Sequence, residues 1–372
     1  MPGSERLEAL TGLRFVAASL IMAHHISYLG VPQLHFRTGQ GVSIFFVLSG
    51  FILAYVHPTM DGWRQGGRFL VNRFARIWPA HAVTLLAAIV VLNQPVTNYT
   101  WTNLLLLHSW VPSSDYYFSH NQVSWSVSTE LGFYLMFPLL IYKWRSTYIW
   151  KIALTVVLAV AIIRTTDYLQ LGRYSLEPKV TGHGLIYINP ATRLLEFVVG
   201  IASCSAYRWL APRMPSKGMI FSYLEIASVG LFVVAAVGKP EQWLYPITST
   251  GFREWLAGSS CLPAAAAMII VFAFGRGDIS TVLKTKVFIF LGEISYSLYL
   301  CHMIVFQYFY WNLRAPEVTL LSVAVPIAVS IACAAILWRY VEVPITKSVK
   351  AIGRKPAPPP EAVTSPTLVA AA

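Results

Sequence analysis

Ten apolar runs, most of them close to the length of a membrane-spanning helix, follow one another along this chain of 372 residues. A helix needs about 20 apolar residues to cross the hydrocarbon core of a bilayer. Only 12% of the residues are charged, about half the share found in soluble domains. The pattern excludes a soluble enzyme, a disordered protein and a disulfide scaffold, and it predicts an all-α, polytopic transmembrane bundle. The expected spans are 10–30, 41–57, 77–93, 126–144, 150–165, 191–210, 221–238, 259–275, 287–311 and 319–341.

Basic residues are distributed unevenly between the two sets of loops. The N-terminus, the even-numbered connections and the C-terminus hold 20 of the 28 Lys and Arg, whereas the opposite set holds seven and Arg193 lies inside a span. The positive-inside rule explains this better than nucleic-acid binding does, although the net charge is +12. We expect both termini in the cytoplasm, the loop 94–125 outside, and no nucleic-acid partner.

The domain organisation predicted from the sequence is simple. Residues 1–350 form one transmembrane domain, and 351–372, which are rich in Pro and Ala, form a disordered cytoplasmic tail. A cleaved signal peptide is the alternative for the first run, but the run contains two histidines and lacks an A-x-A site. The four cysteines show no CxxC spacing, and we expect them to pack as small core residues.

Ionisable residues inside spans are costly and mark candidate sites. Arg14 and His25 are eleven residues apart, so a helix places them on one face and about 16 Å apart. Arg14 then lies at the cytoplasmic boundary and His25 near the middle of the membrane, while His24 points about 80° away, toward packing. The structural alternative is a snorkelling arginine and a hydrogen-bonded core histidine.

Two neighbouring segments predict close helix packing and an anion-binding site, respectively. Residues 41–51 interleave small and aromatic residues, which is typical of close helix packing. In the basic loop that follows, Arg73 and Arg76 are three apart and share a face if helical. Forked guanidinium groups suit phosphates, although membrane topology alone also explains such arginines.

Further ionisable and aromatic residues lie in later spans. Glu130, Arg193 and Glu196 have similar outer depths, so we expect them to pair with one another inside the bundle. The outer loop 94–125 is rich in aromatic side chains and has no basic residue, which suits either a sugar or an interfacial belt. The remaining candidates from these spans are Trp125, Tyr134, Tyr296 and His302.

Seven short motifs occur in one order over residues 10 to 345, and together they resemble the acyltransferase-3 family of bacterial integral-membrane acyltransferases. No motif for a zinc enzyme, a P-loop nucleotidase or a serine hydrolase is present. The matching pieces are Arg14-x10-His25, Phe45-Phe46-Val47-Leu48-Ser49-Gly50-Phe51, Arg73-x-x-Arg76-Ile77-x-Pro79, Trp125-Ser126…Glu130…Phe133-Tyr134, Arg193-x-x-Glu196-Phe197-x-x-Gly200, Ser295-Tyr296-Ser297-x-Tyr299-x-x-His302 and Glu342-x-Pro344.

The resemblance implies an activity and a set of roles. It implies transfer of an acyl group, usually acetyl from acetyl-CoA, to a hydroxyl of a free or lipid-linked carbohydrate or glycoside. It implies His25 and Glu130 in catalysis, Arg14 as the partner of His25, and Arg73, Arg76 and Arg14 in donor binding. Acceptor-side or structural positions are Arg193, Glu196, Trp125, Tyr134, Tyr296 and His302. No metal and no permanently bound cofactor are implied, since acetyl-CoA is a co-substrate.

One departure from the family pattern and several open points remain. Many family members have an acidic residue and a glutamine after the glutamate, whereas Leu131 and Gly132 follow Glu130 here. The chain ends after a short tail, so we expect the stand-alone form without an esterase-like domain, in a bacterial inner membrane. The rival function is a transporter or flippase of a glycolipid or polysaccharide. The sequence leaves open the acceptor, the acyl group, the oligomeric state and the choice between direct transfer and an acyl-histidine intermediate.

Overall fold

The computed structural model describes residues 7–32, 36–174, 180–215, 218–244, 247–313 and 318–352. Helices account for most of these residues, and the described part of the chain contains no strand. The all-α prediction is therefore confirmed. The predicted tail 351–372 lies, from residue 353 onward, outside the described residues.

Every predicted span overlaps a helix. These ten helices are α1 (Glu8–His24), α2 (Gly41–Val56), α3 (Trp63–Val91), α6 (Trp125–Ile141), α7 (Trp144–Tyr168), α8 (Pro190–Leu210), α9 (Ile220–Gly238), α12 (Leu262–Phe274), α15 (Ser295–Asn312) and α16 (Leu320–Leu337).

Shorter elements connect them. The helices are α4 (Asn98–Leu104), α5 (Ser114–Tyr117), α10 (Pro240–Trp243), α11 (Thr250–Ser259), α13 (Asp278–Leu283), α14 (Lys286–Glu293) and α17 (Val343–Ile352). Single turns of 3₁₀ helix are η1 (Ile26–Leu29), η2 (Thr38–Gln40), η3 (His108–Trp110), η4 (Gln122–Ser124) and η6 (Ala211–Arg213), and η5 (Gly184–Ile188) and η7 (Trp338–Glu342) are π turns.

Fewer than ten of the described helices are long and apolar enough to cross a membrane. Among the described residues, seven helices are long and apolar enough to cross a membrane, and α14 with α15, bent by 65°, makes an eighth if the pair is one span. The helices α1 and α6 have 17 residues each, about 26 Å against the roughly 30 Å of hydrocarbon. The count of ten and the side of each terminus therefore stay predictions.

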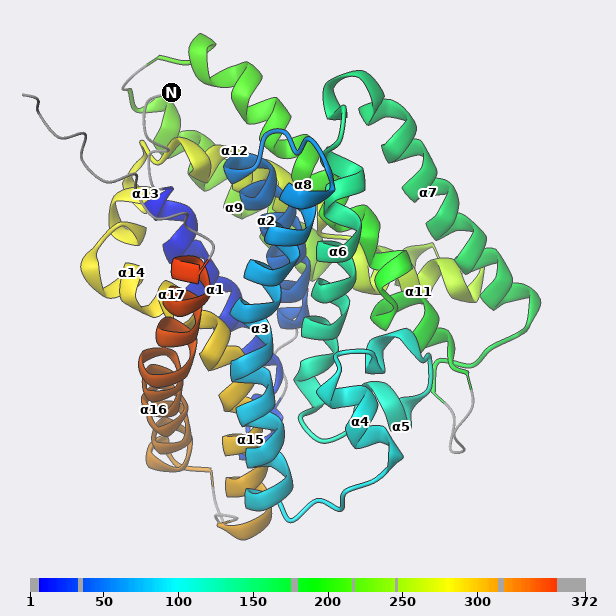
Figure 1. The fold of residues 1–372 in the computed structure, drawn as a ribbon, viewed down its shortest axis with the longest axis vertical. Helices are drawn as coiled ribbons and strands as arrows, with labels where there is room; N and C mark the ends of the chain where they lie inside the picture. The colour runs from blue at the N-terminus through cyan, green and yellow to red at the C-terminus, as the bar shows by residue number, and fades with distance from the viewer. Residues whose placement is uncertain are drawn as a thin grey trace, which may run out of the picture.

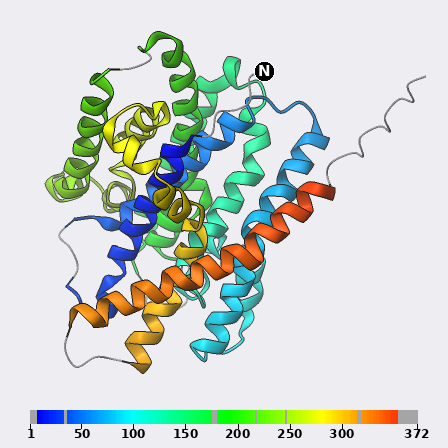
Figure 2. The same cartoon turned by 90° about the vertical axis from the view of Figure 1, so that its left-hand side faces the viewer.

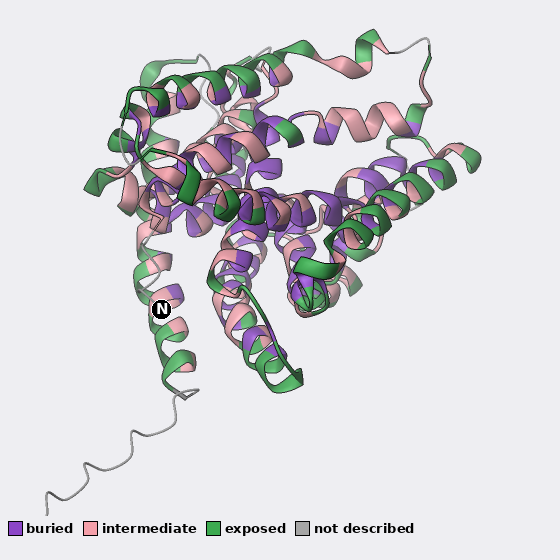
Figure 3. Ribbon diagram, turned by 90° about the horizontal axis from the view of Figure 1, so that it is seen from above, coloured by how far each residue is buried: buried purple, intermediate pink, exposed green. Residues whose placement is uncertain are grey.

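The bundle is built around α2. This helix is buried along most of its length, whereas α7 lies at the periphery and exposes much of its apolar surface (Figure 1). Buried residues gather in the middle of the bundle and exposed ones on the outer helices, as Figure 3 shows. The helices α16 and α17 follow one another along one line on a face of the bundle (Figure 2). The turn η7 joins them and brings Glu342 toward α3.

The predicted close packing of residues 41–51 is observed where α2 crosses α8. A Cβ atom built on Gly50 would lie 2.0 Å from the carbonyl oxygen of Phe197, and one on Gly200 would lie 2.0 Å from that of Val47. Since real Cβ atoms do not approach a carbonyl this closely, only glycine permits the two backbones to touch. Small residues have this role in many membrane helix pairs.

Replacing Gly200 with alanine is expected to destabilise the protein by about 1–3 kcal/mol, because the helices α2 and α8 must move apart. Thermal unfolding of the detergent-solubilised protein measures the loss. Gly230→Ala is the matched control, since a Cβ atom there meets nothing within 4 Å. Equal unfolding temperatures for the two variants would show that the α2–α8 crossing tolerates an extra methyl group.

Candidate active site

Two histidines from opposite ends of the sequence meet inside the bundle. His25 directly follows α1, and its Nδ1 lies 3.1 Å from Nε2 of His302 on α15. The Nδ1 of His302 lies 3.2 Å from the carbonyl oxygen of Leu298, one turn earlier in α15. His302 is fully buried, whereas His25 is partly exposed. The structure therefore places His302, predicted on the acceptor side or in a structural role, in direct contact with His25.

His25 lines a cavity of about 690 Å³, which we call the histidine cavity. Its wall includes Trp125 and also His24, which hydrogen-bonds weakly to Thr38 at 3.5 Å. The expectation that His24 points away toward packing is therefore wrong. The helix α1 ends at His24. The two histidines therefore line the cavity from the C-terminal end of α1 and not from its middle turns.

Several charged and aromatic residues of this wall were missed by the sequence interpretation. Arg37 forms an ion pair with Glu241, and Glu254 accepts from His183 at 2.7 Å and pairs with Arg173 at 3.2 Å. These residues come from separate loops and short helices, and no sequence motif connects them. They are Arg37, Arg173, Tyr174, His183, Tyr187, Glu241, Arg253 and Glu254.

The aromatic loop 94–125 contributes less to this cavity than expected. Of its aromatic residues only Phe118 and Trp125 line it, and Trp101 is exposed elsewhere. The loop is tied to the bundle instead, for example through Asn121, whose amide donates to the carbonyl of Leu300 on α15 at 2.9 Å. Within the loop, Nε2 of His108 lies 3.1 Å from Oγ of Ser124. Burial lowers the pKa of His108 to about 3, so this ring is neutral and structural at ordinary pH.

A second cavity, of about 700 Å³, contains the three predicted donor-binding arginines, and we call it the basic cavity. Arg76 forms an ion pair of 3.1 Å with the buried carboxylate of Glu342. Arg73 lies over the ring of Phe69, and its buried Nε atom has no hydrogen-bond partner in the described part of the chain. No hydrogen bond or ion pair joins Arg14 to the described residues. The basic side chains of the lining are Arg14, Arg73, Arg76, Arg339, Lys347 and Lys350, against the acids Glu130 and Glu293.

Glu130 faces the basic cavity. Its carboxylate accepts hydrogen bonds from the hydroxyls of Ser49 at 3.0 Å and Tyr134 at 2.6 Å. The expected pairing of Glu130 with Arg193 and Glu196 is therefore not observed, since similar depth does not place two helices face to face. Tyr134 and Tyr296 also line the basic cavity, and Tyr296 donates to the carbonyl of Ile77 at 2.6 Å.

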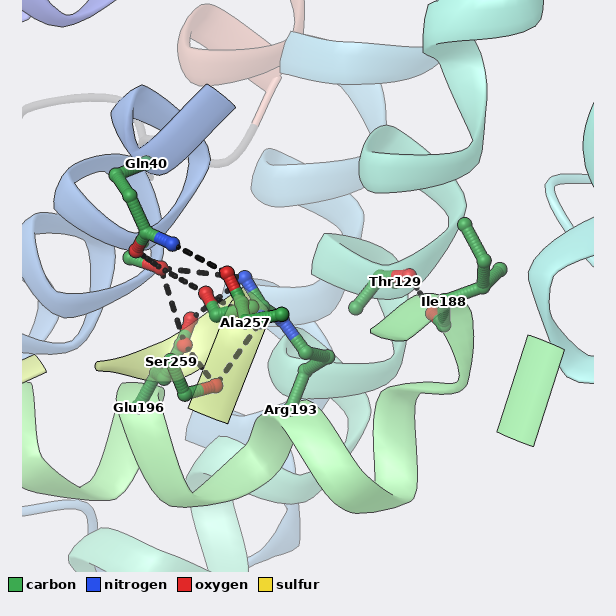
Figure 4. A network of polar contacts seen from close by, with 9 residues as sticks. Gln40, Thr129, Ile188, Arg193, Glu196, Ala257 and Ser259 are labelled. Carbon is green, nitrogen blue, oxygen red and sulfur yellow. Dashed lines mark hydrogen bonds and ion pairs between the residues drawn. The ribbon is translucent and has the colours of Figure 1, made fainter. Parts of the chain in front are cut away.

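Arg193 and Glu196 form a closed network behind the histidine cavity. Their ion pair measures 3.0 Å, and the hydroxyls of Ser43 and Ser259 donate to the same carboxylate (Figure 4). The guanidinium of Arg193 lies between the rings of Phe46 and Tyr187. Both charged residues are fully buried and line neither cavity, so this geometry favours the structural role over the acceptor-side one.

The two cavities meet at Val42 and Tyr299, which belong to both linings. The Tyr299 hydroxyl is held by Ser126 and by the carbonyl of Val123, both at 2.7 Å. Arg14, which lies within α1, lines one cavity, and His25, directly after the C-terminal end of α1, lines the other. The arrangement offers a basic chamber and a histidine-containing chamber separated by one layer of side chains.

Comparison with known proteins gives one family. A family model described as an acyltransferase domain, acyltransferase 3, matches residues 7–339. The acyltransferase MdmB of Streptomyces mycarofaciens is 32% identical over 338 residues, covering 82% of this chain and 81% of the relative. No solved structure matches.

Two more distant relatives are longer than this chain. The peptidoglycan O-acetyltransferase OatA of Listeria monocytogenes is 23% identical over 91% of this chain and 56% of its own length. The putative O-acetyltransferase SACOL0978 of Staphylococcus aureus is 22% identical over 94% of this chain and 59% of its own length. This chain therefore spans little more than half of either relative.

Proposed function

The chain belongs to the acyltransferase-3 family, and on that premise we propose that it is a membrane O-acyltransferase. It moves an acyl group, in the first instance acetyl, from acyl-CoA to a hydroxyl of a carbohydrate or glycoside. The observation that carries the proposal is the pair of cavities that meet at Tyr299, one basic and one containing His25. The named relatives include O-acetyltransferases, one of them of peptidoglycan, which supports a carbohydrate acceptor.

The basic cavity is suited to the phosphates of CoA. Arg14 and Arg73 have no ion-pair partner among the described residues, so their guanidinium groups can each take a phosphate oxygen pair. Arg76 is held by Glu342 and shapes the wall beside them. An acyl-pantetheine arm that starts at these arginines reaches His25 by passing between Val42 and Tyr299.

The histidine cavity is suited to an uncharged acceptor. Two of its three arginines, Arg37 and Arg173, are already paired with Glu241 and Glu254, so a ligand that binds them by charge would have to break these pairs. The rings of Trp125 and Tyr187 can cover the apolar face of a sugar. The acceptor hydroxyl then gives its proton to a neutral His25 and attacks the thioester carbonyl, and CoA leaves as the free thiol.

The rival function, transport or flipping of a glycolipid, does not account for a cationic chamber and a histidine chamber in contact. The deciding experiment uses the purified protein in detergent with labelled acetyl-CoA and candidate glycans, and it follows free thiol and labelled sugar. Turnover that depends on the glycan supports acyl transfer. A glycan that binds without any thiol release favours the transporter.

Replacing Arg73 with alanine is expected to weaken acetyl-CoA binding by about 1.5–3 kcal/mol, because a charge-assisted hydrogen bond to phosphate is lost. Calorimetry on the purified protein measures the affinity. Lysine at this position should restore the affinity only in part, since an ammonium group cannot form the two parallel hydrogen bonds that a guanidinium makes with a phosphate. The matched control is Arg68→Ala, which removes an exposed arginine of the same helix outside the cavity. Unchanged affinity in the Arg73 variant would leave topology as the sole role of this arginine.

The orientation of the protein gives a further prediction. The basic residues of the basic cavity lie on or beside segments that the charge distribution puts in the cytoplasm, and much of the polar wall of the histidine cavity comes from segments that it puts outside. Cysteines at Gly67, where a side chain has free space, and at the exposed Asp115 should therefore react with an impermeant maleimide from opposite sides. Reaction of both from one side of intact cells would overturn the proposed donor path.

A further inference from the structure

We propose that His302 is a positioning residue that fixes the tautomer of His25, leaving Nε2 of His25 as the proton acceptor in the histidine cavity. This inference rests on the proposed function. The two rings are in contact, with centroids 5.3 Å apart. Neither ring has a carboxylate hydrogen-bond partner among the described residues, so the pair differs from the usual arrangement in which an acid orients the histidine.

The direction of the two hydrogen bonds follows from what each atom can do. A carbonyl oxygen only accepts, so the Nδ1 of His302 must carry the hydrogen that points to Leu298 at 3.2 Å. A neutral imidazole has one N–H, and the fully buried His302 has no anion beside it to hold a second proton. Its Nε2 is therefore an acceptor.

The other ring must complement this acceptor. The contact of 3.1 Å between Nε2 of His302 and Nδ1 of His25 is a hydrogen bond only if His25 carries its hydrogen on Nδ1. The lone pair of His25 then lies on Nε2, the ring nitrogen that His302 leaves available. In the other tautomer that nitrogen holds a hydrogen and cannot take the proton of an acceptor hydroxyl.

The surroundings of His302 keep this arrangement in place. Its ring packs against those of Tyr299 and Phe306, with centroids 5.9 and 5.7 Å away. Tyr299 is itself held by two hydrogen bonds at the junction of the cavities. The ring of His302 is thus in contact with three rings, those of His25, Tyr299 and Phe306. His302 acts on the reaction only through its hydrogen bond with His25.

The reaction step that depends on this tautomer is balanced. The hydroxyl proton of the acceptor moves to Nε2 of His25 as the oxygen forms a bond to the thioester carbon. The carbon–sulfur bond then breaks, and the same proton passes from Nε2 to the CoA sulfur. Throughout, the hydrogen on Nδ1 stays in its bond with His302, so His25 returns to its starting state.

Two amide substitutions at position 302 separate positioning from packing. The oxygen of glutamine reaches close to the place of Nε2 and can accept from His25, whereas the shorter asparagine reaches only the place of Nδ1. We expect His302→Asn to lower kcat at least about tenfold, a part of the general-base contribution, with KM and acetyl-CoA affinity unchanged. His302→Gln should recover a large part of kcat.

A second measurement does not require turnover. Diethyl pyrocarbonate modifies an unprotonated imidazole nitrogen, and peptide sequencing by mass spectrometry resolves His25 from the neighbouring His24. The ratio of His25 to His24 modification should fall severalfold in His302→Asn and stay near the original value in His302→Gln. Equal kcat values and equal ratios for the two variants would overturn the inference. An original protein without acyl transfer would count against the proposed function instead, while the modification ratios still test the tautomer.

Discussion

Replacement of His25 by alanine is expected to lower the rate of acyl transfer at least about a hundredfold, because a general base contributes about 10²–10⁴ to a rate. His25 lines the cavity on the acceptor side and has its Nδ1 engaged by His302. Neither His25 nor His302 lines the basic cavity. The affinity for acetyl-CoA, measured by calorimetry, should therefore stay within about twofold while turnover in the labelled-acetyl assay is lost.

His24 provides the matched control for this variant. It is the same residue type, it lines the same cavity, and its ring centroid lies 5.1 Å from that of His25. It does not contact His302, and its hydrogen bond to Thr38 is long. His24→Ala should therefore keep a substantial fraction of the activity. Similar, mild losses for both variants would mean that neither histidine is the base, and Glu130 would become the next candidate.

The helices could be predicted from the sequence because the length and apolar composition of each run are enough to indicate a helix. The same holds for Gly50, because the small residues of the segment 41–51 predict close helix packing before any partner is known. Arg73 and Arg76 were also accessible from local spacing, and both line one cavity. In each case the information lies within a few residues of the feature.

Contacts between distant segments were not accessible in this way. His25 and His302 are 277 residues apart in the sequence. The expected depth of each residue in the membrane does not predict that α1 packs against α15. The ion pairs of Glu254 with Arg173 and His183 join α11 to the segment before η5, and the two share no sequence pattern. For Glu130 the sequence predicted a contact that does not exist. Glu130 and Arg193 were expected at a similar depth in the membrane, but the Glu130 carboxylate accepts from Ser49 and Tyr134 and is not paired with Arg193.

Replacement of Glu196 by glutamine is expected to cost about 3–5 kcal/mol of stability, because it leaves the buried guanidinium of Arg193 without an anion. The amide oxygen can still accept from Ser43 and Ser259, so the variant removes the charge and little else. A large drop in the thermal unfolding temperature in detergent is the expected result. The network joins α2, α8 and α11, so the whole inner bundle should loosen.

Two further variants decide whether the loss comes from the unpaired charge. Asp278→Asn also neutralises one acid, but Asp278 is exposed and its carboxylate accepts only from Ser222 among the described residues; its cost should stay within about 1 kcal/mol. The double variant Arg193→Met with Glu196→Gln removes both charges and should recover much of the lost stability, because apolar replacement of a buried pair is often neutral. A Glu196→Gln protein with normal unfolding and lost turnover would instead move this pair from the scaffold into the chemistry of the site.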